Sequence, residues 1–431
     1  MSISVSSPRP VTPLAPAARP AGKHVADARP LEVRNVRPWG GDAVDLTVVD
    51  GTITAITPHA AHTSDRSDSA TTQADRTING RSLLALPGFA NVHAHSDKSW
   101  WGKPWQPYGG VATTQGRIEH EREHRDRLGI PGVQTSTQVL REYLRHGTTV
   151  QRTHVDVDTG VGLRGIEAIR EANQALGETI VTQIVAFPQD GVLRRPGVLE
   201  LLDQAATAGA DYIGGLDPAS IDRDPVGQLD GIFAIAERHG CGIDVHLHDG
   251  GELGAFQIEL MIDRTIRHGL QGKVNVAHGL ALGQLSTSRQ ADLIAGMAEA
   301  GVSVTSVSPI RVAPLPLREL LEAGVAVGLG TDGFRDLWGP YGDGDMLKVA
   351  LKTAQVCGLR YDEDLALAVE LASSRGAAFA GVASHNLQVG DRADIVLLDA
   401  ENTMDALTRT PAREFVVAGG KVVVADGELL V

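Results

Sequence analysis

Histidines and carboxylates stand in short runs where several strand-like segments of the chain end. The first run is ANVHAH (residues 90–95), in which the alternation of side chains along a strand directs His93 and His95 to the same face. Later runs contain His246, His278 and Asp332. Imidazole nitrogens with a single carboxylate suit a transition metal such as zinc or iron, whereas calcium and magnesium prefer oxygen ligands. The spacing predicts a metal site built from distant parts of the chain.

The elements that must position these residues alternate between strands and helices from about residue 88 to residue 380, as in parallel βα units. Helical segments are expected at 166–175 and 253–268. The strand candidates are LLALPGFANVH, TTVQRTHV, TIVTQIVAF, ADYIGGL, CGIDVHLH, KVNVAH, VSVTSV and AVGLGTD. Eight such units predict a closed (β/α)8 TIM barrel, in which chemistry takes place at the C-terminal ends of the strands. The four runs follow such ends, so we expect them to converge.

Both ends of the chain differ from this middle part. Residues 1–30 are rich in Pro, Ala, Ser and Arg, and we expect a disordered tail. Short strand-like pieces broken by turn residues occupy 31–87 and return in 381–431. The sequence thus predicts an α/β protein with three parts: the tail, a small β-sandwich domain made from 31–87 plus 381–431, and a barrel domain at 88–380.

Composition excludes several classes of protein. The 431 residues are 42% hydrophobic and 21% charged, as in soluble globular proteins, and no apolar run approaches the roughly 20 residues that span a bilayer. The net charge of −14 disfavours nucleic acid and anionic membranes as partners. The two cysteines, Cys241 and Cys357, fit a reducing compartment. We expect a cytoplasmic homo-oligomer with a small-molecule substrate.

The order of the runs is similar to that of the amidohydrolase superfamily: H-x-H, then a histidine on the fifth strand, one on the sixth and an aspartate on the eighth. Four longer segments resemble the cytosine deaminase branch, and the likeness extends over most of residues 80–420. These are QIVAFPQDG (183–191), GADYIGG (209–215), IDVH (243–246) and GTDGFRDLWGPYGDGDML (330–347).

The resemblance implies one set of roles for the metal and another for the substrate. It implies iron or zinc as the metal, with His93, His95, His246 and Asp332 as ligands. By the same resemblance His278 stabilises the attacked centre, Gln189 binds substrate, and Trp338 covers the heterocycle. No lysine in QIVAFPQDG or ADYIGGL is available to bridge a second ion, so we expect a single one.

The chemistry of these residue types is hydrolytic. A divalent ion lowers the pKa of bound water from about 15.7 toward roughly 7, which gives hydroxide at neutral pH. Asp332 can accept the proton of that water, and His278 can stabilise oxygen charge on the attacked carbon. A further acid must protonate the departing nitrogen.

The candidate for the acid that protonates the departing nitrogen differs from that of the cytosine deaminase branch. The branch has a glutamate three residues after the fifth-strand histidine. Asp249 stands there in this chain, and Glu252 is a competing candidate. By strand alternation His248 faces the same side as His246 and is an alternative ligand. His154 is assigned to structural hydrogen bonding.

The residues expected to recognise the substrate also differ from those of the cytosine deaminase branch. The branch has a second acidic residue directly after the metal aspartate, where Gly333 stands here, so recognition of cytosine itself is in doubt. Lys98, in His95-Ser96-Asp97-Lys98, either binds an anionic ring or pairs with Asp97.

These observations predict metal-dependent hydrolytic deamination of a cytosine-like, pterin-like or aminotriazine-like heterocycle. Hydrolysis of a cyclic amide or another C–N bond by the same site is the first alternative. A catalytically inert binding protein with this fold is the second alternative, and its preparation would contain no transition metal.

Overall fold

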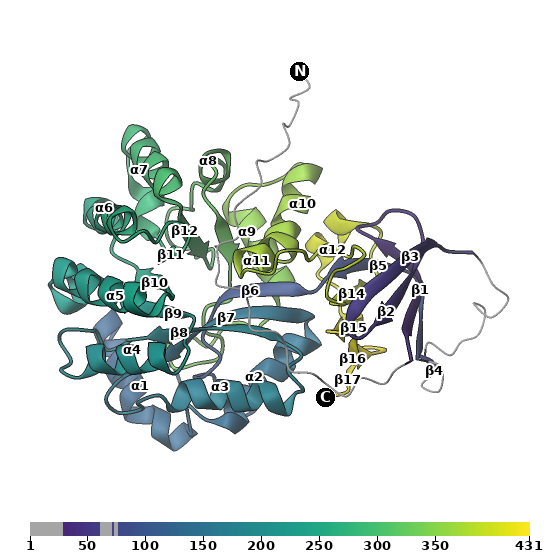
Figure 1. Cartoon of the computed structure of the whole chain (residues 1–431), viewed down its shortest axis with the longest axis horizontal. Coiled ribbons are helices and arrows are strands. Elements are labelled where there is room, and N and C mark those ends of the chain that lie inside the picture. Colours follow the sequence, from purple (N-terminus) through teal and green to yellow (C-terminus); the bar gives the residue numbers. More distant parts are fainter. Residues whose placement is uncertain (1–28, 61–70, 73–75) are drawn as a thin grey trace.

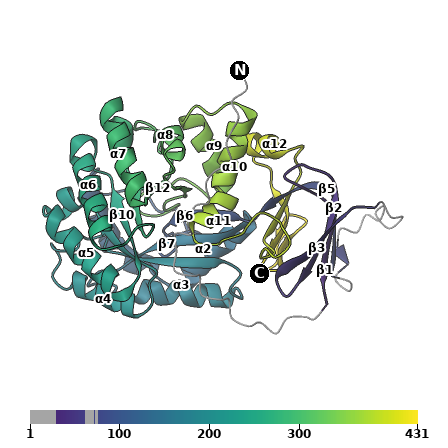
Figure 2. The same cartoon turned by 45° about the horizontal axis from the view of Figure 1, so that its top comes forward.

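The computed structural model describes residues 29–60, 71–72 and 76–431, which form two β-sheets with helices around one of them (Figure 1). The predicted tail falls, apart from its last two residues, outside the described part of the chain. Helices pack around the outside of one sheet, and the second sheet lies at one end of the molecule (Figures 1 and 2).

The first sheet consists of eight parallel strands that follow one another in chain order from β6 to β13. They are β6 (Phe89–Ala94), β7 (Thr148–Asp156), β8 (Val181–Phe187), β9 (Tyr212–Leu216), β10 (Gly242–Leu247), β11 (Val274–His278), β12 (Val302–Ser306) and β13 (Val327–Leu329). A parallel bridge between Ala94 and Asp332 brings the first and last strands together, and the Asp332 N–H donates to the His93 carbonyl (3.0 Å). This near-closed barrel confirms the predicted fold class.

Helices follow these strands along the chain, with long loops at 95–113 after β6 and at 330–345 after β13. They are α1 (Thr114–Leu128), α2 (Val133–Arg145), α3 (Arg164–Ala175), α4 (Val198–Thr207), α5 (Pro225–His239), α6 (Gly251–Arg267), α7 (Thr287–Ala300), α8 (Leu317–Glu322), α9 (Met346–Val356), α10 (Asp362–Leu371), α11 (Ser374–Phe379) and α12 (Thr403–Arg409), with short turns η2 (Pro218–Asp222) and η3 (Leu280–Gln284). The helices predicted at 166–175 and 253–268 correspond to α3 and α6. Their buried apolar residues pack against the strands in one continuous core.

The second sheet is mixed and combines strands from both ends of the chain. Its strands are β1 (Leu31–Pro38), β2 (Val44–Val49), β3 (Thr52–Pro58), β4 (Thr71–Thr72), β5 (Thr77–Pro87), β14 (Ile395–Leu398), β15 (Arg413–Ala418), β16 (Lys421–Ala425) and β17 (Glu428–Leu429). Strand β5 pairs in parallel with β1 and antiparallel with β14, which joins the N-terminal and C-terminal strands. A second β-unit made from both ends is therefore confirmed, and the three-part domain division stays a prediction.

The predicted first barrel strand, LLALPGFANVH, is divided between the two sheets. The break comes at Pro87-Gly88, where β5 ends and β6 begins. Proline lacks an N–H for a sheet ladder. A Cβ on Gly88 would lie 2.1 Å from the Thr149 hydroxyl oxygen, so only glycine fits this passage into the barrel. Sequence pattern alone reads the two strands as one because both are apolar.

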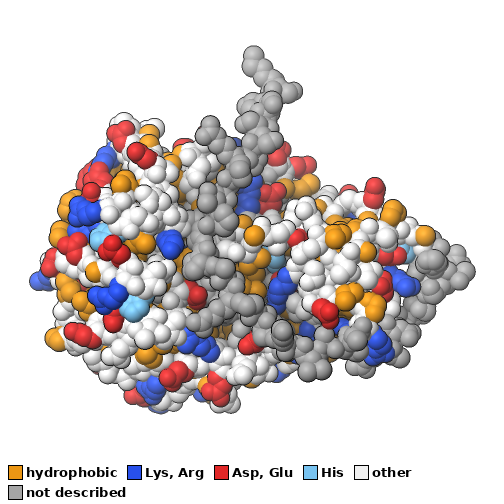
Figure 3. All heavy atoms as spheres, in the orientation of Figure 1, with side chains coloured by type: hydrophobic (Ala, Val, Ile, Leu, Met, Phe, Trp, Pro, Cys, Tyr) orange, Lys and Arg blue, Asp and Glu red, His pale blue; other side chains and the backbone are white. Residues whose placement is uncertain are grey.

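Charge is mixed on the surface. On the face that Figure 3 shows, acidic and basic side chains are interspersed, with hydrophobic side chains scattered among them. No helix within the described ranges combines the length and apolarity that crossing a bilayer requires. The homo-oligomer and the cytoplasmic location stay predictions.

Candidate functional site

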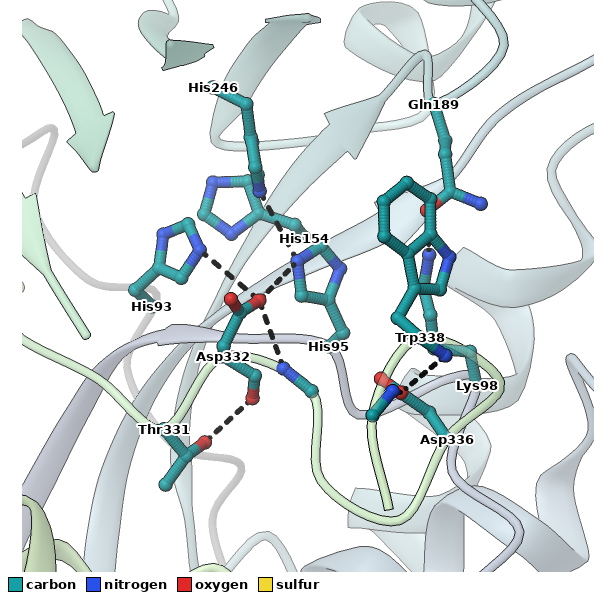
Figure 4. Close-up of polar contacts among 12 residues, drawn as sticks. His93, His95, Lys98, His154, Gln189, His246, Thr331, Asp332, Asp336 and Trp338 are labelled. Atoms are coloured by element: carbon teal, nitrogen blue, oxygen red, sulfur yellow. Dashed lines mark hydrogen bonds and ion pairs between the residues drawn. The ribbon is translucent and has the colours of Figure 1, made fainter. Parts of the chain in front are cut away.

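The predicted histidines and aspartate at the strand ends lie close together at one end of the barrel. His93 lies near the end of β6, and His95 is the first residue after this strand. His246 lies on β10, His278 ends β11, and Asp332 follows β13. Asp332 Oδ1 lies 3.7 Å from His93 Nε2 and 3.3 Å from His95 Nε2. His95 Nε2 is 3.2 Å from His246 Nε2, and the rings of His93 and His278 are centred 4.8 Å apart. Figure 4 shows the His93, His95 and His246 rings directed toward Asp332.

Two of these residues have backbone conformations that residues other than glycine rarely adopt. His278 and Asp332 both lie in the left-handed region, with φ of 67° and 63°. Such strain in residues other than glycine clusters at functional sites. Between β13 and Asp332, Gly330 packs directly on β6, because a Cβ there would lie 2.3 Å from the His93 carbonyl oxygen. The closure of the barrel and the position of His93 therefore depend on the same contact.

The donor set fits a divalent transition metal. Ligand atoms of His93, His95, His154 and His246 lie within 4.8 Å of one another, and those of His93, His278 and Asp332 form an overlapping group. His93 Nε2, His95 Nδ1, His246 Nδ1 and His278 Nε2 are buried without a hydrogen-bond partner among the described residues. Unpaired buried nitrogens are costly, and a shared cation is a physical reason for gathering them.

Burial keeps these imidazoles in the form that a metal requires. It lowers the pKa of His95 to about 3 and that of His154 to about 4. Burial also takes the pKa values of His246 and His278 well below the usual range. For Asp332, burial is opposed and outweighed by the neighbouring His93 and His95 rings, which hold its pKa well below its usual value. Neutral imidazoles and an ionised carboxylate are the ligand forms of these groups.

His154 has a second environment besides the histidine cluster. Its Nε2 lies 3.2 Å from Asp244 Oδ1, and Arg152 Nη1 donates to Asp244 Oδ2 at 3.2 Å. Burial alone raises the pKa of Asp244, but His154 and Arg152 bring it to about 2. The structural role predicted for His154 is compatible with this contact, while its ring also stands 4.4 Å from that of His93.

A cavity of about 220 Å³ opens beside the cluster. It is lined by His95, Lys98, Phe187, Gln189, Leu216, His246, His248, His278, Asp332, Gly333, Asp336, Trp338 and Gly339. The predicted substrate-binding residues Lys98, Gln189 and Trp338 are thus brought to the same cavity as the predicted ligands. Figure 4 shows these three residues grouped on one side of Asp332.

Lys98 is the centre of a buried polar network. Its Nζ donates to Asp156 Oδ1 and to Gln189 Oε1, both at 2.6 Å, and lies 3.7 Å from Glu121 Oε1. The expected alternative partner, Asp97, instead accepts the Asp156 backbone N–H. Burial opposes the charge on Lys98, but Asp156 and Glu121 outweigh it and raise the pKa of Lys98, so the lysine stays cationic.

Helix α1 completes this network from above the strand ends. Glu121 is buried and accepts a hydrogen bond from the Trp338 indole Nε1 (2.5 Å). Two ion pairs fasten the helix: Arg125 with Asp158, and Arg122 Nη1 with Asp190 Oδ2 (2.5 Å). The indole of Trp338 is therefore fixed at the cavity by a helix that follows the first barrel strand.

The residues after β10 separate into an inner and an outer set. His248 lines the cavity, and its Nδ1 lies 2.9 Å from Asp217 Oδ2. Asp249 is half-buried outside the lining, where its Oδ2 accepts from Gln257 Nε2 (3.0 Å). Glu252 is exposed and pairs with Arg289. Of the three, only His248 is a neighbour of His278, with ring centres 4.4 Å apart.

Comparison with known proteins agrees with this architecture. Residues 137–424 match the model of the Amidohydrolase family. The chain is 30% identical over 369 residues to N-isopropylammelide isopropyl amidohydrolase of Pseudomonas sp. (strain ADP), a match that covers 81% of this chain and 88% of the relative. The chain belongs to the amidohydrolase family. The predicted resemblance is confirmed, and this amidohydrolase is an enzyme of a class that acts on carbon–nitrogen bonds.

Two further comparisons extend over nearly the whole amidohydrolase chain. The crystal structure of N-isopropylammelide isopropylaminohydrolase from Burkholderia multivorans superposes with a TM-score of 0.85 at 39% identity, and covers 93% of this chain and all of that one. Pterin deaminase of Rhizobium rhizogenes is 26% identical over 397 residues, which is 88% of this chain and 87% of that enzyme.

Sequence reasoning missed several residues of the amidohydrolase site. Asp217 follows the strand ADYIGGL directly, so the rule that placed the histidines at strand ends applies to it too. Asp156 ends β7 in the same way. Glu121 lies in a helix crowded with charged residues and nothing in its local sequence distinguishes it. Asp336 lies in the loop after Asp332, where an aspartate is normally read as a turn former.

Proposed function

We propose that this amidohydrolase hydrolyses the exocyclic C–N bond of an amino-substituted nitrogen heterocycle and releases ammonia or an alkylamine. The observation that carries the proposal is a single cavity with the histidine–aspartate cluster at one side and the Lys98, Gln189 and Trp338 group at the other. The names of the relatives, which include an isopropylammelide hydrolase and a pterin deaminase, support the substrate class. An N-alkylated aminodioxotriazine is our first choice of substrate.

We propose one divalent ion, zinc or iron, with His93, His95, His246 and Asp332 as its ligands. When bound, such an ion lowers the pKa of a coordinated water from about 15.7 toward roughly 7 and so supplies hydroxide. The close approach of the Nε2 atoms of His93 and His95 to Asp332 Oδ1, and of His246 Nε2 to His95 Nε2, supports this assignment. His154 is close enough to compete as a ligand, but its approach to Asp244 favours a supporting role.

Asp332 and His278 act on the attacking water and on the attacked carbon. Asp332 borders the cavity and its low pKa keeps it ionised, so its carboxylate has lone pairs available to accept the proton of the water. His278 Nε2 is buried without a hydrogen-bond partner among the described residues and belongs to a cavity-lining side chain. A hydrogen bond from this ring would stabilise the charge that develops on the substrate during attack.

Protonation of the departing nitrogen needs a donor at the cavity, and we assign it to His248. Partial burial alone lowers the pKa of His248, but the hydrogen bond with Asp217 outweighs this and raises it. Its Nδ1 is held by Asp217, and no described residue hydrogen-bonds to its Nε2. The sequence-based assignment of this role to Asp249 stays as the competing hypothesis, because that carboxylate is one residue away.

Gln189, Lys98 and Trp338 recognise the ring. Lys98 Nζ has three N–H groups, of which Asp156 and Gln189 accept two. The third makes no hydrogen bond to a described residue, although Glu121 Oε1 lies 3.7 Å away, and we assign it to an oxo group or an anionic ring in the cavity. The Trp338 indole offers an apolar face to a flat heterocycle, and such stacking adds about 0.5–1.5 kcal/mol to the burial of its surface.

The test is a turnover screen of zinc-loaded and iron-loaded protein with N-isopropylammelide, pterin and cytosine, followed by detection of free amine or ammonia. We expect turnover of at least one ring, and none in Asp332→Asn. Ring opening without release of amine would indicate cyclic amide hydrolysis instead. Absence of turnover and of bound metal would favour an inert protein.

Three variants separate the candidate proton donors. His248→Gln should lower kcat while the metal content stays that of the wild type, and Asp249→Asn should have a smaller effect. Glu252→Gln is the matched control, because Glu252 is an exposed carboxylate on the same segment that pairs only with Arg289 among the described residues. A larger loss of kcat in Asp249→Asn than in His248→Gln would return the role to Asp249.

A further inference from the structure

The carboxylate of Asp336 occupies the space that a side chain at position 333 would fill. A Cβ built on Gly333 would lie 1.7 Å from Asp336 Oδ2 and 2.9 Å from its Cγ. Both residues line the cavity. The glycine therefore does not leave a gap, because a carboxylate from three residues further along the chain enters the same volume.

The two oxygens of Asp336 have different environments. Oδ1 accepts the backbone N–H groups of Trp338 and Gly339, both at 2.8 Å, which fixes the carboxylate to its own loop. Oδ2 accepts no hydrogen bond from any described residue. The residue is only 6% exposed. Asp336 lines the cavity, so a ligand that displaces water from this oxygen must supply a donor in its place.

The loop that carries Asp336 is held in place by aromatic packing. The Arg335 guanidinium lies 4.4 Å from the centre of the Trp100 ring and 5.0 Å from that of Trp101. The Trp100 N–H donates to the Arg335 carbonyl at 2.9 Å. Tryptophans of the segment after β6 thus clamp the segment after β13, and the position of Oδ2 is set before a ligand arrives.

We propose that Asp336 is a specificity-determining residue that accepts a hydrogen bond from a ring N–H of the bound heterocycle. Its carboxylate fills the volume that a side chain at position 333 would occupy. The ligand class follows from the chemistry: a lactam-type ring with an N–H beside an oxo group, which donates to Asp336 and accepts from Lys98. This inference rests on the proposed function for the identity of the ring, but not for the existence of the acceptor.

The first test is Asp336→Asn, which preserves shape and replaces an acceptor with an amide. Oδ1 of the new residue can still accept the two loop N–H groups, while its NH₂ group meets the ring N–H donor. Burial raises the pKa of Asp336 to about 7, so the comparison is made at about pH 8.5, where the carboxylate is ionised. Loss of a hydrogen bond to this charged group predicts a KM or Kd raised roughly 10- to 100-fold. Metal content should not change. A variant with wild-type KM and Kd for every ring that the wild type binds would overturn the proposal.

The matched control is Asp391→Asn, in the loop before β14. Asp391 is also a buried carboxylate that accepts two backbone N–H groups of its own loop, those of Asn386 (2.7 Å) and Gln388 (3.0 Å). It therefore reports the cost of the same chemical change away from the cavity. An equal rise of KM in both variants would show that Asp336→Asn acts by destabilising its loop, and would overturn the proposal.

A second test uses the steric relation between the two positions. Gly333→Ala should displace the Asp336 carboxylate and raise KM, whereas in an Asp336→Ala background the same alanine should change KM little. Gly333→Asp combined with Asp336→Ala should recover part of the lost affinity. Additive effects of the two alanine substitutions, with no recovery by Gly333→Asp, would contradict a shared volume and overturn the proposal.

A direct binding assay separates this inference from the proposed function. If wild-type protein turns over none of the screened rings, the proposed function fails, and cyanuric acid serves as the probe because its ring offers three N–H donors. Binding is followed by the tryptophan fluorescence of metal-loaded protein. Weaker binding to Asp336→Asn than to wild type would sustain the inference. Equal binding, or no binding to wild type, would overturn it.

Discussion

Replacement of Gly330 by alanine tests how barrel closure positions the candidate ligands. The new Cβ would lie 2.3 Å from the carbonyl oxygen, 2.5 Å from the Cβ and 2.6 Å from the backbone nitrogen of His93. Ordinary contacts begin at 3.4 Å, so β6 and the segment after β13 must separate by about 1 Å. Two of the three atoms belong to the backbone of His93, so rotation of a side chain cannot relieve the overlap.

The expected cost has two parts. Overpacking of a tight interior contact costs about 1–3 kcal/mol, and weakening of the hydrogen bond from Asp332 N–H to His93 O adds about 1 kcal/mol. We therefore expect the free energy of unfolding to fall by about 2–4 kcal/mol. Metal–ligand distances tolerate only about 0.2 Å of error, so a shift of His93 by about 1 Å should also weaken metal affinity at least roughly tenfold.

The assay is urea unfolding of metal-free protein, together with competition for zinc against a chromogenic chelator. Gly296→Ala is the control, because Gly296 lies within α7 and its added Cβ would approach only the flexible end of Ile262 at 3.3 Å. Alanine in a helix interior is expected to leave stability unchanged or raised. Wild-type stability and wild-type zinc affinity in Gly330→Ala would refute the argument that one contact closes the barrel and sets His93.

Three other predictions concern separate parts of the molecule. Arg413 and Asp345 form a buried ion pair that joins β15 to the start of α9. Arg413→Met should lower the free energy of unfolding by about 3–5 kcal/mol in urea titrations, because it leaves the Asp345 charge without its partner. Adding Asp345→Asn should recover part of the loss, and no recovery would contradict the pairing. Trp338→Phe keeps an aromatic face but loses the hydrogen bond to Glu121, and should raise KM for a turned-over ring by roughly threefold to tenfold, measured by steady-state kinetics. An unchanged KM would show that this hydrogen bond does not position the aromatic face for the substrate. Zinc at 100 times its Kd should stabilise the metal-free protein by about 2.7 kcal/mol in thermal unfolding, and no shift of Tm would contradict a metal site in the folded state.

Much of the fold could be predicted because periodicity reports it directly. The eight barrel strands and the return of strand pattern after residue 381 are local features of composition and spacing. The division of LLALPGFANVH at Pro87-Gly88 could not be predicted from apolarity alone. It depends on Thr149, which occupies the space beside Gly88 and is distant in sequence.

Part of the candidate site could be predicted from the same strand pattern. Residues at strand ends, such as His93, His246 and Asp332, could be placed together because parallel strands end at one rim of a barrel. The roles of Glu121 and Asp336 could not be predicted, since they depend on how helix α1 and the loop after β13 fold back over the rim. The choice between Asp249 and His248 also required the position of Asp217, which only the folded chain brings beside them.

The most direct measurement of the central claim is anomalous diffraction from crystals of metal-loaded protein, recorded at the absorption edge of zinc or iron. We expect one peak, enclosed by His93, His95, His246 and Asp332. A second peak of equal height would contradict the single ion, and no peak among these side chains would contradict the catalytic proposal itself.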